Sequence, residues 1–167
     1  DDDSDNCYHV MQYTSSLTLD NVVIQHGNAN YDPLDYSTQS NTLHRYGGAL
    51  ITSSVARTTY LYLNNVVIRN NTAINGGGLW IASNDGNKVD VIIKDSKFEQ
   101  NRAIDGVYEG GYGGAIYDMF LANLTVLNTR FKDNQAAFRG GAIYQDYGAL
   151  LHADGCTFRG NSVNGYG

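Results

Sequence analysis

Two similar segments of this chain end in carboxylates that could take part in acid–base chemistry. The segments read GGAIYD at Gly113–Asp118 and GGAIYQD at Gly140–Asp146. Because the segments resemble each other, Asp118 and Asp146 are expected to lie close together, and glycoside hydrolysis needs paired carboxylates. The remaining carboxylates are scattered and no basic column accompanies this pair, so no catalytic residue is assigned. A polysaccharide lyase or hydrolase is kept as the alternative function.

Tyrosine is frequent, with 13 copies in 167 residues. Tyr117 and Tyr144 hold equivalent positions in the two segments, and Trp80 follows a related Gly-Gly pair. Side chains alternate between the two faces of a strand. If the isoleucine before each tyrosine points inward, the aromatic rings form an exposed column that can stack on sugars or on another protein. The alternative is cross-strand packing that only stabilises the sheet.

Two insertions provide a second candidate contact surface. They span Asn30–Tyr46 and Ile104–Tyr112, and both lie between an asparagine-containing motif and a Gly-Gly pair. They should therefore project from the same corner of the fold, and insertions on one face of a repeat array often form the binding face. The expected contact residues, besides the aromatic column, are Tyr31, Tyr36, His44, Arg45, Tyr46, Tyr108 and Tyr112.

Metal and cofactor sites are not expected. The four histidines occupy four different positions of the repeat, which is unlike a metal cluster. The N-terminal DDDSDN resembles the start of a calcium loop, but Asn6 and Gln12 stand where an EF-hand needs glycine and glutamate. A solvated acidic segment is the better interpretation of this stretch.

The strands and corners that must position these residues can be predicted from an internal repeat in the sequence. The motif Phe-x-x-Asn-x-Ala, with variants, recurs at intervals of 44, 30, 33 and 27 residues, and a Gly-Gly pair follows the first four copies. Apolar residues seven and five positions before the anchor, and again two before it and at it, alternate as in short strands. The residue three positions before each anchor is Asn, Asp or Gly, types that tolerate a left-handed corner. The anchors are Ile24, Ile68, Phe98, Phe131 and Phe158.

This unit predicts three short strands and three corners, which is one coil of a parallel β-helix. The chain is accordingly predicted to be all-β, with about five coils stacked roughly 4.8 Å apart. Stacking places equivalent residues in columns, so the motif asparagines should form an amide ladder in which each bonds the next coil. These structural asparagines are Asn71, Asn101, Asn134 and Asn161.

The paired GGA[ILV] and FxxN motifs resemble the repeats of chlamydial polymorphic membrane proteins and related surface proteins. The resemblance covers about residues 17 to 167. It implies a right-handed parallel β-helix in a secreted or surface protein that is often adhesive. The motif residues of this family build the scaffold, so the resemblance transfers no catalytic residue. The first copy departs from the pattern because Gly27 stands at the asparagine position.

The composition of the chain and its expected boundaries limit the classes of partner that it can bind. Residues 1–16 are assigned to an acidic N-terminal segment or cap and residues 17–167 to the repeats, with further coils or a stacking partner expected beyond the C-terminus. The net charge of −6 disfavours nucleic acid and anionic membrane. No apolar run reaches 18 residues, so no membrane span is expected, and no signal peptide is present.

The cysteines and the glycosylation sequons give little further information about the function. Cys7 and Cys156 are expected several coils apart, too far for a disulfide, so Cys156 is interpreted as a buried free thiol, and Cys7 could pair outside this segment. Asn70 and Asn123 begin two N-glycosylation sequons. Together these features predict an extracellular or cell-surface β-helix with a structural and adhesive function. Its partner would be a glycan, another protein or a second copy in a filament or surface array.

Overall fold

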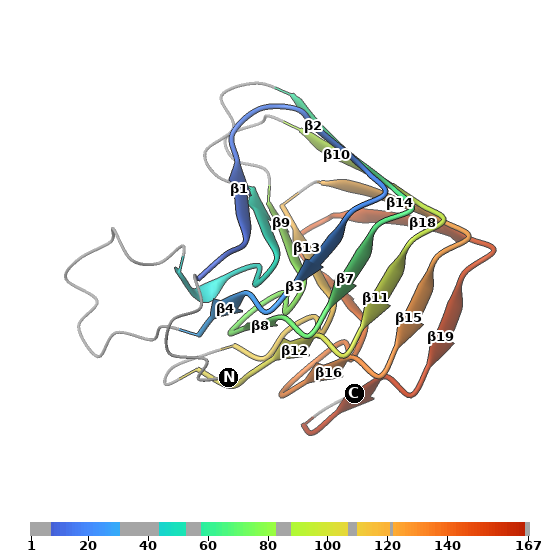
Figure 1. Ribbon diagram of the computed structural model, residues 1–167. Helices are drawn as coiled ribbons and strands as arrows, with labels where there is room; N and C mark the ends of the chain where they lie inside the picture. Colours follow the sequence, from blue (N-terminus) through green and yellow to red (C-terminus); the bar gives the residue numbers. More distant parts are fainter. Residues whose placement is uncertain are drawn as a thin grey trace.

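The computed structural model describes residues 8–30, 44–52, 58–82, 88–106, 110–120 and 122–165. It is a parallel β-helix of five coils, as predicted, in which twenty strands form four sheets of five strands each. Every pair of neighbouring strands is parallel, and the coils follow one another in sequence order through the stack (Figure 1). The right-handed sense of winding stays a prediction.

Two of the four sheets, A and B, contain all the strands that are longer than three residues. Sheet A contains β1 (Met11–Tyr13), β5 (Leu50–Thr52), β9 (Leu79–Ala82), β13 (Ile116–Met119) and β17 (Ile143–Gln145). Sheet B contains β2 (Leu17–Asp20), β6 (Thr59–Asn64), β10 (Val89–Lys94), β14 (Asn123–Leu127) and β18 (Leu150–Asp154). The strand β1 lies upstream of the expected boundary at residue 17, yet it pairs with β5 as part of sheet A.

The strands of the other two sheets have three residues each in sheet C and two in sheet D. Sheet C contains β3 (Val23–Gln25), β7 (Val67–Arg69), β11 (Lys97–Glu99), β15 (Arg130–Lys132) and β19 (Thr157–Arg159). Sheet D contains β4 (Asn28–Ala29), β8 (Thr72–Ala73), β12 (Arg102–Ala103), β16 (Gln135–Ala136) and β20 (Ser162–Val163). The prediction of three strands per coil was therefore wrong, because each coil has four and the fourth is a two-residue strand.

Left-handed corners explain how the short strands are separated. The predicted corner between sheets B and C has positive φ in every coil, at Asn21, Asn65, Asp95, Asn128 and Gly155. A second corner, between sheets C and D, was not predicted and lies at His26, Asn70, Gln100, Asp133 and Gly160. Each corner turns the chain with one residue, and this second turn is what creates the fourth strand.

The core is made of columns of inward side chains. Phe98 and Phe131 are fully buried, with ring centroids 5.1 Å apart, and Phe131 stacks on Phe158 at 4.8 Å. Beside this stack, the Ser96 hydroxyl accepts from the Val66 backbone N–H at 3.0 Å. Polar ladders therefore run through the core next to the aromatic stack.

The asparagine ladder is the most regular of these columns. Asn71 Nδ2 donates to Asn101 Oδ1 at 2.9 Å, and Asn101 Nδ2 donates to Asn134 Oδ1 at 3.0 Å. Asn134 Nδ2 in turn donates to Asn161 Oδ1 at 2.8 Å. In the first coil Gly27 replaces asparagine, and its backbone N–H donates to Asn71 Oδ1 at 2.9 Å. The ladder thus ties all five coils together.

Candidate functional site

The candidate site is a groove on the outer face of sheet A, where the chain bends at the Gly-Gly pairs. Gly113 has φ of +65°, and a Cβ on Gly114 would collide with the carbonyl oxygen of Gly141 in the next coil. The first glycine therefore permits the turn and the second permits the close stacking of coils. The bend places the residue before each pair against the outward residues of sheet A.

Two columns of side chains form the walls of the groove. Isolated parallel bridges join Tyr46, Asn75, Tyr112 and Arg139, which precede the four Gly-Gly pairs. On sheet A, strand pairing aligns Trp80 with Tyr117 and Tyr117 with Tyr144. Trp80 is thus in register with the tyrosines. In its coil the two glycines that correspond to Gly113 and Gly114 are Gly76 and Gly77, not Gly77 and Gly78.

Aromatic rings from the two columns interleave. Tyr46 stacks on Trp80, with centroids 4.7 Å apart and planes 10° apart. Tyr112 stacks on Tyr144 at 5.1 Å and lies 5.8 Å from Tyr117. Two of the predicted insertion residues, Tyr46 and Tyr112, therefore meet the predicted aromatic column in one surface, although the insertions and the column were predicted as two separate candidates.

The expected exposure of two residues was wrong. Tyr117 is only 6% exposed, because Tyr112 and Tyr144 cover the outer face of its strand. Arg45 is only 3% exposed, and its backbone carbonyl accepts from the Ile74 and Asn75 N–H groups instead of projecting in a ridge. Burial raises the pKa of the Tyr117 hydroxyl above its usual value, and the charge of Asp146 adds to the rise, so this hydroxyl stays neutral.

The end of the groove is formed by residues that the sequence reasoning missed. Phe120 and Tyr147 follow the two GGAI segments at the same distance, and their rings stack at 5.0 Å. They are 41% and 64% exposed, and both have positive φ, at 58° and 51°. A left-handed backbone costs a bulky residue roughly 1–2 kcal/mol. The two exposed rings therefore lie at costly backbone positions, and their common distance from GGAI was the signal that could have found them.

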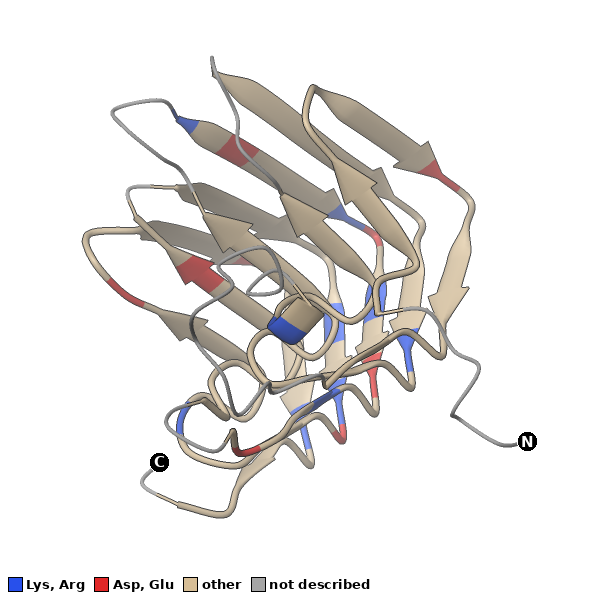
Figure 2. Ribbon diagram, turned by 90° about the vertical axis from the view of Figure 1, so that its left-hand side faces the viewer, with Lys and Arg blue, Asp and Glu red and all other residues tan. Residues whose placement is uncertain are grey.

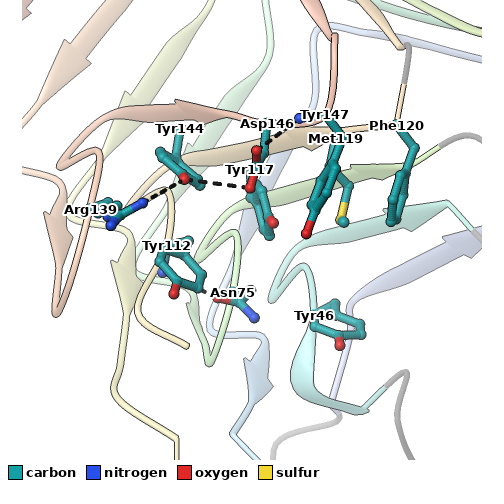
Figure 3. Close-up of a pocket in the computed structure, with 10 residues that line it drawn as sticks. All are labelled: Tyr46, Asn75, Tyr112, Tyr117, Met119, Phe120, Arg139, Tyr144, Asp146 and Tyr147. Atoms are coloured by element: carbon teal, nitrogen blue, oxygen red, sulfur yellow. Dashed lines mark hydrogen bonds between the residues drawn. The ribbon is translucent and has the colours of Figure 1, made fainter. Parts of the chain in front are cut away.

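A chain of polar groups lines the same end (Figure 3). Arg139 Nη1 donates to Tyr144 Oη at 3.3 Å, and Tyr144 Oη donates to Asp146 Oδ2 at 3.5 Å. Asp146 Oδ1 accepts from the Tyr147 backbone N–H at 2.8 Å. The sequence reasoning missed Arg139 in this role. These groups supply a cationic donor, a hydroxyl and an anionic acceptor beside exposed rings.

The cavity enclosed by the groove measures about 220 Å³. Ten residues line it: Tyr46, Asn75, Tyr112, Tyr117, Met119, Phe120, Arg139, Tyr144, Asp146 and Tyr147. This volume is below the range of about 300–1,000 Å³ typical of pockets that enclose a whole small molecule. The site therefore fits one unit of a longer ligand, with ring faces for apolar contact and three polar groups for orientation.

The carboxylate pair expected for an enzyme does not form. Asp118 points into the core and is fully buried, whereas Asp146 lies in the groove on the opposite face of sheet A. Only their backbones meet, through the Asp146 N–H and the Asp118 carbonyl at 3.0 Å. Strand alternation causes this separation, because Asp118 pairs with Gln145 and the additional residue shifts Asp146 to the other face. The expectation that the two carboxyl groups lie close together was therefore wrong.

The other candidate residues lie away from the groove or outside the described ranges. His44 stacks on Tyr8, with centroids 4.1 Å apart, and lies 6.1 Å from His9, whose pKa is lowered by burial. In the described part of the chain, no three His, Cys, Asp or Glu residues are grouped to hold a metal. The remaining contact candidates, Tyr31, Tyr36 and Tyr108, lie outside the described residues.

The sequons and cysteines have simple surroundings. Asn70 is exposed at a corner, while the Asn123 amide donates to Asp90 Oδ1 at 2.6 Å. Glycosylation of either stays a prediction. Cys156 is a free, half-buried thiol near the carbonyls of Val126 and Asp154, and Cys7 lies outside the described residues.

Comparison with known proteins supports the repeat type. The sequence model of the Chlamydia polymorphic membrane protein (Chlamydia_PMP) repeat matches residues 128–146, which contain the Asn134 ladder position and the GGAI segment of the groove. The resemblance is thereby confirmed over this repeat. No curated protein and no solved structure matches the chain. The family that is defined by this repeat is typical of surface proteins and is not a family of enzymes. Separately, the described residues contain no long apolar helix able to cross a bilayer.

Proposed function

We propose, with the surface-protein repeat as the premise, that this chain is a rigid adhesive segment that attaches to a saccharide through the aromatic groove. The β-helix is the rod, since its coils are fixed to one another by backbone bonds and by the asparagine ladder. The groove is the contact surface. Its position on the outer face of sheet A leaves it open to a ligand beside the rod.

The observation that carries this proposal is the pair of strained, exposed rings beside the polar chain. Phe120 and Tyr147 offer apolar faces, while Arg139 and Asp146 offer a donor and an acceptor at the same end of the groove. A sugar ring has an apolar face of C–H groups and an edge of hydroxyls, so it can use both features together. A protein partner would need a larger apolar patch for a stable interface.

The proposal predicts a selective loss of binding in Tyr147→Ala. This variant removes a 64% exposed ring and its stacking contact with Phe120, so we expect affinity for the best saccharide on a glycan array to fall about tenfold, or ~1.4 kcal/mol. Isothermal titration calorimetry with that saccharide measures the change. Tyr60→Ala is the matched control, because Tyr60 is 56% exposed and lies on sheet B.

Equal losses in both variants would contradict the groove as the site. Filaments in electron micrographs of the purified chain, together with no binding to any glycan, would replace adhesion with an architectural role in self-assembly. Cleavage of a bound polysaccharide would instead favour the enzyme alternative.

A further inference from the structure

The outer face of sheet C is basic although the chain as a whole is acidic. Its outward positions, which flank the anchor residue in each of β3, β7, β11, β15 and β19, carry five cations and one anion. The anion is Glu99. The cations, which we name the basic face, are Arg69, Lys97, Arg130, Lys132 and Arg159.

The neighbouring sheet shows that this is not a general property of the surface. The outward positions of sheet B carry one cation, Lys94, and three anions, Asp20, Asp90 and Asp154. Figure 2 shows the basic segments recurring from coil to coil along the lower part of the molecule. The net charge of −6 therefore conceals a local positive field on one side of the rod.

Part of the basic face is neutralised and part is free. Arg130 Nη2 lies 3.1 Å from Glu99 Oε1, and Lys132 Nζ lies 3.2 Å from Asp133 Oδ2. Arg69 Nε donates to the neutral Gln25 Oε1 at 2.8 Å, and no described carboxylate forms an ion pair with it. Among the described residues, Lys97 and Arg159 form no ion pair, and both side chains are exposed.

We propose that the basic face binds a linear sulfated polysaccharide. The cations spread over four successive coils, so they match a long ligand with repeated anionic groups better than a single compact anion. Three of them are arginines, whose planar guanidinium bonds two oxygens of one anionic group at once. This site is separate from the aromatic groove, which lies on sheet A.

The shape and composition of the face favour a polysaccharide over other polyanions. No outward residue of sheet C is aromatic, so the face lacks the stacking platforms that bind single-stranded nucleic acid. It consists of short strands and has no helix to enter a DNA groove. Its one strongly exposed large apolar residue is Val23 at 56%, whereas a membrane surface also requires apolar anchoring.

The experiment measures binding of the 167-residue chain to heparin, a sulfated polysaccharide, over a series of salt concentrations. We expect affinity to fall steeply with salt and to vanish with chemically desulfated heparin. The double variant Lys97→Gln/Arg159→Gln should weaken binding at least tenfold and reduce the slope of log affinity against log salt by about 2, near 1 for each lost cation. Circular dichroism checks that the double variant keeps the β-helix.

Lys88→Gln and Arg159→Gln, tested singly, provide a comparison at equal charge. Lys88 is exposed immediately before β10, away from sheet C, so removing its charge should change affinity less than twofold. Equal effects of the two single variants would overturn the proposal, as would tighter binding to single-stranded DNA or to phosphatidylserine vesicles. Tyr147→Ala should leave heparin binding intact. A failure of the proposed heparin site is therefore distinguishable from a failure of the proposed saccharide site in the groove.

Discussion

Asp118 is a carboxyl group in the core of the β-helix. It is fully buried, its Oδ2 accepts from Gln145 Nε2 at 2.8 Å, and its Oδ1 has no hydrogen-bond partner. Burial raises the pKa of this carboxyl from 3.8 to about 7, although the Gln145 hydrogen bond acts in the opposite direction. The folded chain therefore prefers the neutral acid, and Asp118 destabilises the fold when it is charged.

The pH dependence of stability follows from this preference. Because the folded-state pKa lies above the unfolded-state value, the folded state holds an additional proton between pH 3.8 and about 7. The stabilising contribution is complete below about pH 4 and is lost as pH rises through about 7. We expect Asp118→Asn to raise the free energy of unfolding at pH 8, by up to about 4 kcal/mol, and to change it little at pH 4.

Urea unfolding of the variant and the parent chain at both pH values measures this effect. Asp105→Asn is the control for the loss of one carboxylate, since Asp105 is exposed. A variant as pH-dependent as the parent chain would show that another group is responsible.

At the scale of elements, the asparagine ladder connects each two-residue strand of sheet D to the coils on either side. Asn101 is fully buried and has four hydrogen bonds through its side chain. Its Oδ1 accepts from the Asn71 backbone N–H and Nδ2, while its Nδ2 donates to Asn134 Oδ1 and the Ile68 carbonyl. A strand of two residues has few ladder bonds of its own, so these side chains supply much of its attachment.

Asn101→Ala should therefore be strongly destabilising. The substitution leaves several buried polar groups without partners, at about 1–3 kcal/mol for each, so we expect a loss of about 3 kcal/mol or more. Chemical denaturation monitored by circular dichroism measures the loss. Asn123→Ala removes a single half-exposed bond to Asp90 and should cost less than about 1 kcal/mol. Similar costs for the two variants would mean that the ladder does not hold the coils together.

At the scale of the whole molecule, stability should vary with position along the stack. In a solenoid each coil contacts only its neighbours, so a residue gains most where coils lie on both sides. Phe131 lies between Phe98 and Phe158 and is fully buried, whereas Phe158 in the fifth coil is 50% exposed. The same side chain in the same column therefore has two different surroundings.

Phe131→Ala should cost about 3–5 kcal/mol, and Phe158→Ala about 1–2 kcal/mol. Urea midpoints of the two variants against the parent chain give the comparison. Equal costs would indicate that the fifth coil is covered in solution, and light scattering would then show whether a second copy covers it.

Much of the architecture was determined by the sequence alone. The intervals between anchors, the corner residues three positions before them and the motif asparagines were enough to predict a parallel β-helix of about five coils and the columns in its core. These features are local and recur in each coil, so each one is supported by several copies in the sequence. The second corner was missed because its column is less uniform: Asn70, Asp133 and Gly160 suit a left-handed backbone, whereas Gln100 does not.

Only the tertiary structure decided what the surface looks like. The groove joins Tyr46, Tyr112 and Tyr144 from three coils, and the basic face joins five cations from four strands. The face on which a side chain lies depends on strand register, and a shift of one residue moves it to the other side of the sheet. Asp118 and Asp146 illustrate this, since one more residue before Asp146 placed one carboxyl in the core and the other in the groove.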